Sequence, residues 1–236
     1  MTFHGKKKAV TFSYDDGVIQ DRRLVPLLNR YGLKATFNIN SARLGGEEEN
    51  PLCMNGKRIP RNTILKEELP SLYRGHEVAA HTLTHPALPY LSDEEIVREV
   101  EEDRIALSEL VGYEVVGMAY PCGGFQNSDR VERVIRSRTG VRYARTISLG
   151  YSFAPQENLY RYKPTAYHTD YDANFHLAKE FLESEEGIFY IWGHSYEFEV
   201  EDSWSRFEEL CALLAGRKDI FYGTNKEILL DLNQGK

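Results

Sequence analysis

Two histidines four residues apart, His81 and His85, are the first residues whose types and spacing could do chemistry. They lie in the stretch HEVAAHTLTHP, which holds three of the chain's 7 histidines. Pro86 disfavours a helical conformation at the residue before it, so we expect the pair in a tight turn after a strand. Imidazoles beside a carboxylate are typical of a divalent metal site. The alternative is a surface turn that contains two histidines.

A pair of neighbouring carboxylates, Asp15 and Asp16, ends the β-rich stretch KAVTFSYDDG. Two adjacent carboxylates repel each other if both are buried and unpaired, and a bound cation removes that cost. One carboxylate could then hold the metal while the other takes a proton from water. The alternative is a turn in which one aspartate shapes the backbone and the other is solvated. Histidine and carboxylate together favour zinc, and a catalytic site keeps one position open for water.

The elements that must position these residues alternate between strands and helices. Repeated strand–helix units predict mostly parallel strands covered by helices, with ligands at the carboxyl ends of the strands. Asp15, His81 and His194 each follow a predicted strand, as does the segment Pro121–Gly123. These residues would share one face if the sheet curls into a barrel. The expected strands are 8–14, 34–40, 76–81, 115–120, 141–147, 188–192 and 220–224, and the expected helices are 18–32, 91–112, 128–137, 173–184 and 203–216.

Local signals set the ends of two of these helices. Ser92 and Glu95 form a capping-box pattern before the helix at 91–112, and Gly112 is a typical C-terminal stop. Pro26 indicates a late start for the first helix, because proline is tolerated in the first turn of a helix and not in its interior.

Two segments could contact a substrate. Residues 45–63 are polar and rich in Gly and Pro, so we expect a surface excursion with a hairpin turn at Asn55–Gly56, which could rim a cleft. A long connection between the last strands is crowded with aromatic residues, which either stack on sugar rings or pack the loop against the barrel. These residues are Tyr143, Tyr151, Phe153, Tyr160, Tyr162, Tyr167, Tyr171 and Phe175.

Composition indicates a globular chain with one substantial core. The 236 residues are 42% hydrophobic, and the 29 basic and 36 acidic residues give a net charge of −7, which argues against a nucleic-acid partner. No stretch approaches the ~18 apolar residues that span a bilayer. Cys53, Cys122 and Cys211 are too widely spaced to indicate a disulfide framework. With no signal-like segment at the start, we expect a cytoplasmic protein if the sequence is complete and an extracellular one if it was trimmed.

Three motifs occur along the chain in the order TFSYDDG, HTLTHP and IWGHSYEF. They resemble motifs of the polysaccharide deacetylase family, the NodB-homology or carbohydrate esterase family 4 proteins. The first is similar to T-F-D-D-G, the second matches H-[ST]-x-x-H, and the third is similar to a late leucine–histidine motif. The likeness extends from about residue 8 to residue 223. It implies an α/β fold, a distorted (β/α) barrel, with a single catalytic domain over residues 1–236.

The resemblance implies a metal-dependent hydrolase that removes an N- or O-linked acetyl group from a carbohydrate or glycoconjugate, with metal-bound water as the nucleophile. Asp16, His81 and His85 would hold the metal. Asp15 would be the general base, and His194 would be the general acid. Zinc is the expected metal, with cobalt, manganese and nickel as alternatives.

Two other functions stay open at this point. One is a related hydrolase that cuts a non-sugar C–N bond, such as that of a cyclic imide or ureide. The other is a relative that binds a glycan or a metal without catalysis. The expected partner is therefore a small carbohydrate, a glycoconjugate or another amide, and neither nucleic acid nor a membrane span is expected.

The family's third motif, R-x-P-[aromatic]-G, is altered here to AYPCG at residues 119–123. The arginine that would pair with the catalytic base is missing at Ala119. Arg145, at another strand end, could replace it, or it could be a surface residue. The backbone N–H of Cys122 could stabilise an oxyanion, and Tyr120 could contact substrate. We expect that the Cys122 thiol does not bind the metal.

Two further positions are candidates on weaker grounds. Glu197 lies three residues after His194 and could orient its ring, although a solvated glutamate is an equal alternative. The family's fourth motif, an aspartate–tryptophan pattern, has no clear match, and Asp170 and Asp172 are the candidates for it.

Overall fold

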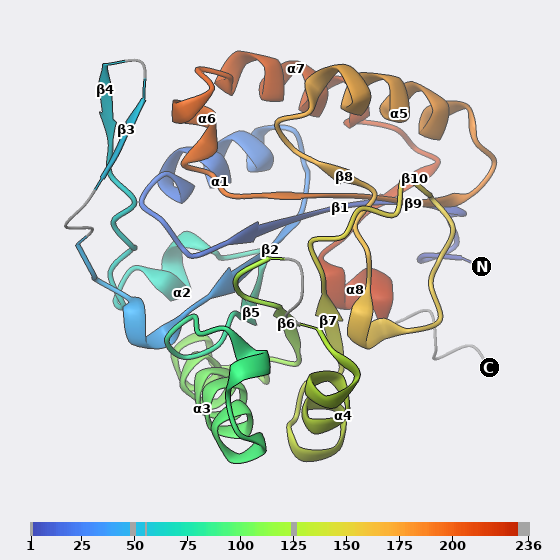
Figure 1. Cartoon of the computed structure of the whole chain (residues 1–236). Helices are drawn as coiled ribbons and strands as arrows, with labels where there is room; N and C mark the ends of the chain where they lie inside the picture. Colours follow the sequence, from blue (N-terminus) through green and yellow to red (C-terminus); the bar gives the residue numbers. More distant parts are fainter. Residues whose placement is uncertain (1, 48–50, 55, 124–126, 231–236) are drawn as a thin grey trace.

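The computed structural model describes residues 2–47, 51–54, 56–123 and 127–230, arranged around one curled sheet (Figure 1). Its strands are β1 (Lys8–Asp15), β2 (Ala35–Ile39), β5 (Glu77–Ala80), β6 (Gly117–Ala119), β7 (Tyr143–Arg145), β8 (Ala166–Tyr167), β9 (Gly187–Gly193) and β10 (Ile220–Tyr222). They run parallel in the order β7-β6-β5-β2-β1-β9-β8, and β10 also pairs with β1. This curled parallel sheet confirms the α/β half-barrel that the alternating sequence pattern predicts.

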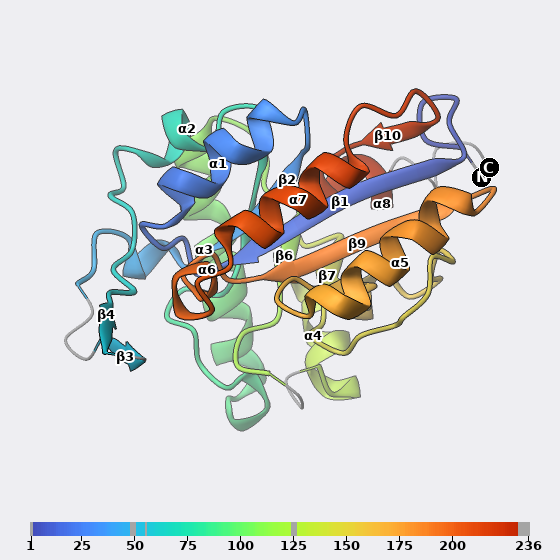
Figure 2. The same ribbon diagram turned by 90° about the horizontal axis from the view of Figure 1, so that it is seen from above.

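Helices pack around the outside of the curled sheet (Figures 1 and 2). The α-helices are α1 (Asp21–Arg30), α2 (Leu69–Leu72), α3 (Asp93–Val111), α4 (Asp129–Arg138), α5 (Tyr171–Glu183), α6 (Glu197–Val200), α7 (Trp204–Leu214) and α8 (Asn225–Leu229), and the 3-10 helices are η1 (Ser41–Arg43), η2 (Leu88–Tyr90) and η3 (Leu159–Arg161). Figure 2 shows α1, α7 and α5 side by side over β1 and β9. Helices α3 and α4 lie on the opposite side, beside β5 and β6 in Figure 1.

Strand β1 is the centre of the core, because all eight of its residues are buried. A parallel strand buried on both faces reads as a nearly continuous apolar run, which explains the composition of KAVTFSY. The ring of Tyr14 packs against Phe37 of β2 and Phe207 of α7, with 6.2 Å between ring centroids in both pairs. Because β2 and β9 flank β1, its last residue, Asp15, lies in the middle of the sheet edge.

Polar contacts of α8 close the barrel at the amino-terminal ends of its strands. The buried side chain of Asn225 accepts a hydrogen bond from Thr11 at 2.9 Å and donates to the Tyr190 hydroxyl at 2.5 Å. The Asn225 backbone N–H donates to the Thr36 hydroxyl at 2.9 Å, and Thr36 donates to the buried carboxylate of Glu77 at 2.7 Å. The carboxyl ends of the strands lie at the opposite end of the barrel, and the candidate site forms there.

Two local sequence predictions are confirmed. Ser92 accepts from the Glu95 N–H at 3.3 Å, Glu95 accepts from the Ser92 N–H at 2.8 Å, and Gly112 ends α3 at a φ of +74°. The polar excursion forms an antiparallel hairpin of β3 (Leu52–Met54) and β4 (Lys57–Ile59), with Gly56 at a φ of +74°. Asn55, the other turn residue, lies outside the described residues.

The expected late start of the first helix is wrong. Helix α1 begins at Asp21, and Pro26 lies inside it. The reason is the buried Asp21 carboxylate, which accepts hydrogen bonds from the hydroxyls of Tyr73 and Ser195 at 2.6 Å each. These contacts fix the first turn of the helix against two other parts of the chain, which outweighs the preference of one proline. The short elements β8 and α6 also lie where the sequence indicated none.

The three cysteines carry free thiols, with Cys53 and Cys122 exposed and Cys211 buried. The free thiols agree with the prediction, made from the wide spacing of the three cysteines, that they do not form a disulfide framework. Within the described ranges, no helix is both long and apolar enough to cross a membrane.

Candidate metal and catalytic site

Asp16, His81 and His85 converge at the carboxyl ends of β1 and β5, as the sequence predicts. One carboxylate oxygen of Asp16 lies 3.6 Å from Nε2 of His81 and 3.6 Å from Nε2 of His85. Among the described residues, this oxygen is buried and has no hydrogen-bond partner. Two ligand atoms about 2.1 Å from a tetrahedral zinc lie about 3.4 Å apart, so this donor set fits a divalent cation.

The protonation of both imidazoles suits metal binding. Nδ1 of His81 lies 2.9 Å from the carbonyl oxygen of Ala119. Because a carbonyl can only accept, this bond places the proton on Nδ1 and leaves the Nε2 lone pair facing Asp16. Burial lowers the pKa of His85 to about 4. Its ring is therefore neutral at neutral pH, as a ligand must be.

The turn that carries the histidines has a strained backbone. The φ angle is +69° at Thr82 and +65° at His85, and it is +75° at Asp16. This left-handed region costs energy for residues other than glycine and clusters at functional sites. The side-chain amide of Asn40 stabilises the turn, because it donates to the carbonyls of His81 at 2.5 Å and Thr82 at 2.8 Å.

Two carboxylates of α3, which the sequence analysis missed, hold the same turn. Glu99 accepts from the N–H and the hydroxyl of Thr84 at 2.9 and 3.0 Å. Asp103 accepts from the backbone N–H groups of His81 at 2.9 Å and Ser41 at 2.7 Å, and burial raises its pKa to about 7. A signal was present, because both carboxylates lie four residues apart on the buried face of the helix, where acidic residues are rare unless paired.

Asp15 is buried and paired with Arg145. The guanidinium donates to both carboxylate oxygens, at 2.5 Å to Oδ1, and Asn38 donates to Oδ1 at 2.8 Å. Burial acts to raise the pKa of Asp15, but the positive charges of Arg145 and His194 lower it below its ordinary value. The carboxylate beside the metal ligands is therefore ionised at neutral pH and able to accept a proton.

Arg145 reaches Asp15 from the strand next to the one where the family's arginine would be. Strands β6 and β7 pair so that Ala119 lies directly opposite Arg145. Side chains opposite each other on neighbouring strands leave the same face of the sheet. Arg145 is fully buried, with its guanidinium 4.4 Å from the Trp192 ring centroid, so the surface alternative for this residue is wrong.

Glu197 holds the ring of His194 and also contacts Tyr167, one of the aromatic candidates, and His168, which the sequence did not single out. Its Oε2 lies 3.2 Å from Nδ1 of His194 and 2.7 Å from Nε2 of His168, and the Tyr167 hydroxyl donates to Oε1. Burial acts to lower the pKa of His194, but the Glu197 hydrogen bond and the charge of Asp16 raise it to about 9. His194 is therefore cationic at neutral pH, and the solvated alternative for Glu197 is wrong.

Tyr120 and Cys122, two candidates from the altered third motif, lie in different surroundings. The backbone N–H of Tyr120 donates to the Arg145 carbonyl at 3.0 Å, and its hydroxyl donates to the Tyr160 carbonyl at 2.9 Å. Both donors are used within the protein and the ring is buried, so the expected substrate contact of Tyr120 is wrong. Cys122 is exposed, and its Sγ lies 3.4 Å from Nδ1 of His85, the nitrogen that does not face Asp16.

The remaining candidates do not join the metal cluster. Asp170 is the N-cap residue of α5, where its carbonyl accepts from Asn174 at 2.8 Å. Asp172 is fully exposed and lies 3.8 Å from Arg206, so neither aspartate takes the place expected from the fourth motif. The aromatic connection packs mostly against the protein, as one of the two interpretations expected. Its buried or core-packed members are Tyr143, Phe153, Tyr160, Tyr162, Tyr171 and Phe175.

Residues 4–144 match the sequence profile of the polysaccharide deacetylase family. This match covers more than half of the chain, and the chain therefore belongs to that family. A search of curated proteins gave no match. The described fold agrees with this membership, because solved structures from the family are similar to it over most of its length.

Three of these structures have TM-scores between 0.53 and 0.65. A protein assigned as a polysaccharide deacetylase from Mycobacterium smegmatis has a TM-score of 0.65 at 16% identity, over 96% of this chain and 90% of that chain. A family 4 carbohydrate esterase from Streptomyces lividans, in complex with acetate, has a TM-score of 0.56 at 16% identity, over 92% and 93%. A family 4 pseudoenzyme from Bacillus anthracis has a TM-score of 0.53 at 17% identity, over 94% and 66%.

At these identities the likeness shows the fold alone. The chain also spans only 55% of a Streptococcus pyogenes deacetylase to which it is similar. Because the family contains pseudoenzymes as well as enzymes, activity must be argued from the residues of this chain.

Proposed function

We propose that this protein is a metal-dependent hydrolase that removes an N- or O-linked acetyl group from a carbohydrate or glycoconjugate. The observation that supports this most is the combination of a three-residue ligand set, Asp16, His81 and His85, with an ionised carboxylate directly beside it. A protein that only binds a metal needs Asp16 and has no need of a buried, charge-paired Asp15. The presence of both argues for catalysis.

The three ligand residues would hold a divalent cation, and zinc is preferred because its protein ligands are typically nitrogen and carboxylate oxygen. Cobalt, manganese and nickel are the alternatives. When bound, the cation supplies Lewis-acid polarisation of the acyl carbonyl and a lowered pKa for water. Asp15 accepts the proton that the attacking water loses, and Arg145 keeps Asp15 ionised and oriented. His194 donates a proton to the leaving group, and Glu197 orients its ring.

Metal content and a substrate panel test this proposal together. We expect the purified protein to bind about one divalent ion per chain, and His81→Ala to lose that ion with its activity, because a three-ligand site does not tolerate loss of a ligand. Elemental analysis measures the ion. Chitooligosaccharides, acetylated xylan and small cyclic amides form the activity panel. Turnover of the cyclic amides alone would support the imide or ureide alternative, and metal binding without turnover of any substrate would support a non-catalytic relative.

The alkaline limit of activity should move when the partner of His194 is neutralised. The Glu197 carboxylate helps to raise the pKa of His194 to about 9, so the donor proton is present at neutral pH and is lost as the pH rises. Glu197→Gln removes this negative charge, and we expect the alkaline limb of the kcat profile to move to lower pH. An unchanged limb would mean that His194 is not the proton donor. Glu201→Gln, at the exposed end of the same short helix, is the matched control.

Cys122 should be dispensable for the metal. Its thiol lies at the Nδ1 side of His85, while the cluster of ligand atoms forms at Nε2. We therefore expect Cys122→Ser to keep its metal content and to change turnover by no more than a few fold. Loss of metal from this variant, or a sulfur at about 2.3 Å from zinc in a metal-soaked crystal, would show a closed structural site instead.

A further inference from the structure

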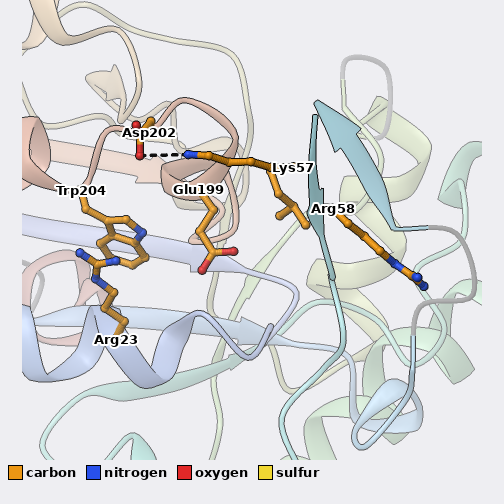
Figure 3. A pocket seen from close by; sticks show the side chains of 7 residues that line it. Arg23, Lys57, Arg58, Glu199, Asp202 and Trp204 are labelled. Atoms are coloured by element: carbon orange, nitrogen blue, oxygen red, sulfur yellow. Dashed lines mark ion pairs between the residues drawn. The ribbon is translucent and has the colours of Figure 1, made fainter. Parts of the chain in front are cut away.

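A pocket of about 460 Å³ lies away from the metal cluster, between the β3–β4 hairpin and the segment that runs from α6 into α7 (Figure 3). Its walls bring together Arg23 from α1, Lys57 from β4, Glu199 from α6 and Trp204 from α7, with Asp202 between the two last helices. Parts of the chain that are far apart in sequence therefore build it, as is usual for a ligand site.

Trp204 points to a missing hydrogen-bond acceptor in this pocket. Its side chain is only 7% exposed, and among the described residues its buried indole Nε1 has no hydrogen-bond partner. Figure 3 shows the nitrogen edge of the indole turned toward Glu199, while the guanidinium of Arg23 lies 4.4 Å from the ring centroid. Buried donors are almost always paired, and Trp N–H can only donate. A ligand oxygen at this edge would satisfy it.

Charges of both signs surround the pocket. Lys57 and Asp202 form an ion pair at 3.3 Å, Arg23 covers the indole, and Glu199 accepts a hydrogen bond from Gln20 at 3.0 Å. Arg58 extends away from the other side chains in Figure 3, as alternation along a strand requires. Two carboxylates against Arg23, Lys57 and the outward-turned Arg58 would not select a strongly charged ligand. They offer donors and acceptors together, which matches sugar hydroxyls, since each hydroxyl both donates and accepts.

The pocket is connected to the proposed acid through α6 and the base of the hairpin. Glu197 contacts His194, and Glu199 lies two residues later, so the two carboxylates leave roughly opposite sides of one helical turn. Gln20 bonds both Glu199 and the carbonyl of Pro60, at 2.8 Å to the latter, which joins the hairpin to α6.

A chain of side-chain contacts runs from His194 to the end of the hairpin. The Tyr196 ring lies 5.4 Å from the His194 ring, and the Arg61 guanidinium lies 5.7 Å from Tyr196. Arg61 follows the hairpin strand that carries Lys57.

We propose that this pocket binds a neutral sugar residue of an oligosaccharide, at a distance from the sugar whose acetyl group is removed. The indole Nε1–H and Lys57 donate to the sugar, and Glu199 and Asp202 accept from its hydroxyls. The subsite would give the enzyme a preference for oligomers over single sugars. It rests on the proposed function for its role in turnover, but its binding chemistry can be measured separately.

Binding is tested with neutral tetrasaccharides that the enzyme cannot deacetylate or need not deacetylate: cellotetraose, xylotetraose and tetra-N-acetylchitotetraose. Calorimetry on the metal-free protein separates binding from turnover. We expect at least one of them to bind, and Trp204→Phe, which keeps an aromatic ring and removes only the donor, to weaken that binding about 3- to 10-fold. Asp202→Ala should weaken it similarly. Lys66→Ala, at an exposed lysine outside the pocket, is the matched control and should not change it.

The kinetic arm uses the metal-loaded protein. For an acetylated tetrasaccharide, Trp204→Phe should raise KM with little change in kcat, and for the acetylated monosaccharide both constants should stay the same. Failure of all three tetrasaccharides to bind, or equal binding by wild type, Trp204→Phe and Asp202→Ala, would overturn the subsite. An inactive protein whose tetrasaccharide binding falls in the pocket variants would refute the proposed reaction and leave the subsite standing.

Discussion

Asp15→Asn is expected to lower kcat on the order of 10²–10⁴-fold while the metal content stays at one ion per chain. Asparagine has nearly the size of aspartate, and it cannot accept a proton. The ligand atoms of Asp16, His81 and His85 are not altered by the change. The measurement is single-substrate kinetics with elemental analysis on the same preparation. Near-full activity of the variant would mean that another base operates.

The same substitution has a second expected result, which comes from the partner of Asp15. Asp15→Asn leaves the fully buried guanidinium of Arg145 without its counterion, and an uncompensated buried charge costs about 3–5 kcal/mol of unfolding free energy. Asp103→Asn is the matched control: this buried carboxylate also lies beside His81, but burial has raised its pKa to about 7. Its neutral replacement should cost less, as measured by denaturant unfolding, and should keep turnover.

The metal ligands could be predicted from the sequence because their signals are local. Asp16 follows a buried strand, and His81 and His85 share one turn, so short spacings and the rule that parallel strands end on one face predict that they meet. That Asp16, and not Asp15, joins the two histidines was implied by the family resemblance. The capping box at Ser92 is local in the same sense. Local patterns also located the strands and the long helices to within a few residues.

The supporting residues could be predicted only in part, because they come from distant parts of the chain: Arg145 was a candidate beside a surface alternative, and His168 was not singled out at all. His168 reaches Glu197 across 29 positions, and Arg145 reaches Asp15 across 130. Whether an arginine on β7 lies opposite Ala119 depends on the strand register, and a shift of one residue would turn it to the other face. The wrong expectation for Pro26 has the same origin, since tertiary contacts of Asp21 decide where α1 begins.

Loss of Arg145 should be the most damaging single change to the fold around the site. Arg145→Ala leaves the Asp15 carboxylate buried without its cation, and we expect about 3–5 kcal/mol of destabilisation. For a chain of this size that corresponds to a fall in Tm of about 6–20 °C. Thermal and denaturant unfolding of the metal-free protein measure it. Arg142→Ala, at an exposed arginine close by in sequence, is the control and should change little.

The pH dependence of that loss identifies its cause. In the wild type, Arg145 holds the pKa of Asp15 below its ordinary value, so the pair contributes stability above that ordinary pKa and loses it in acid. In Arg145→Ala, burial without the cation should raise the pKa of Asp15, so protonation relieves the unpaired charge as the pH falls. The stability difference between the two proteins should therefore shrink from about pH 7 to about pH 4. A constant difference would indicate lost packing against Trp192 instead.

The most direct test of the role of Arg145 moves the arginine from β7 to position 119 on the neighbouring strand β6, where the family has it. Ala119 lies directly opposite Arg145 on β6 and is fully buried, so Arg145→Ala creates room for a long side chain on the same face. We expect Ala119→Arg combined with Arg145→Ala to recover most of the stability and turnover that Arg145→Ala loses, because the guanidinium again reaches Asp15. Ala119→Arg alone should destabilise, since two buried guanidinium groups then compete for one carboxylate. If the double variant is no better than Arg145→Ala, the position of the cation on β7 matters as much as its charge, and Arg145 is not a simple replacement for the arginine missing at Ala119.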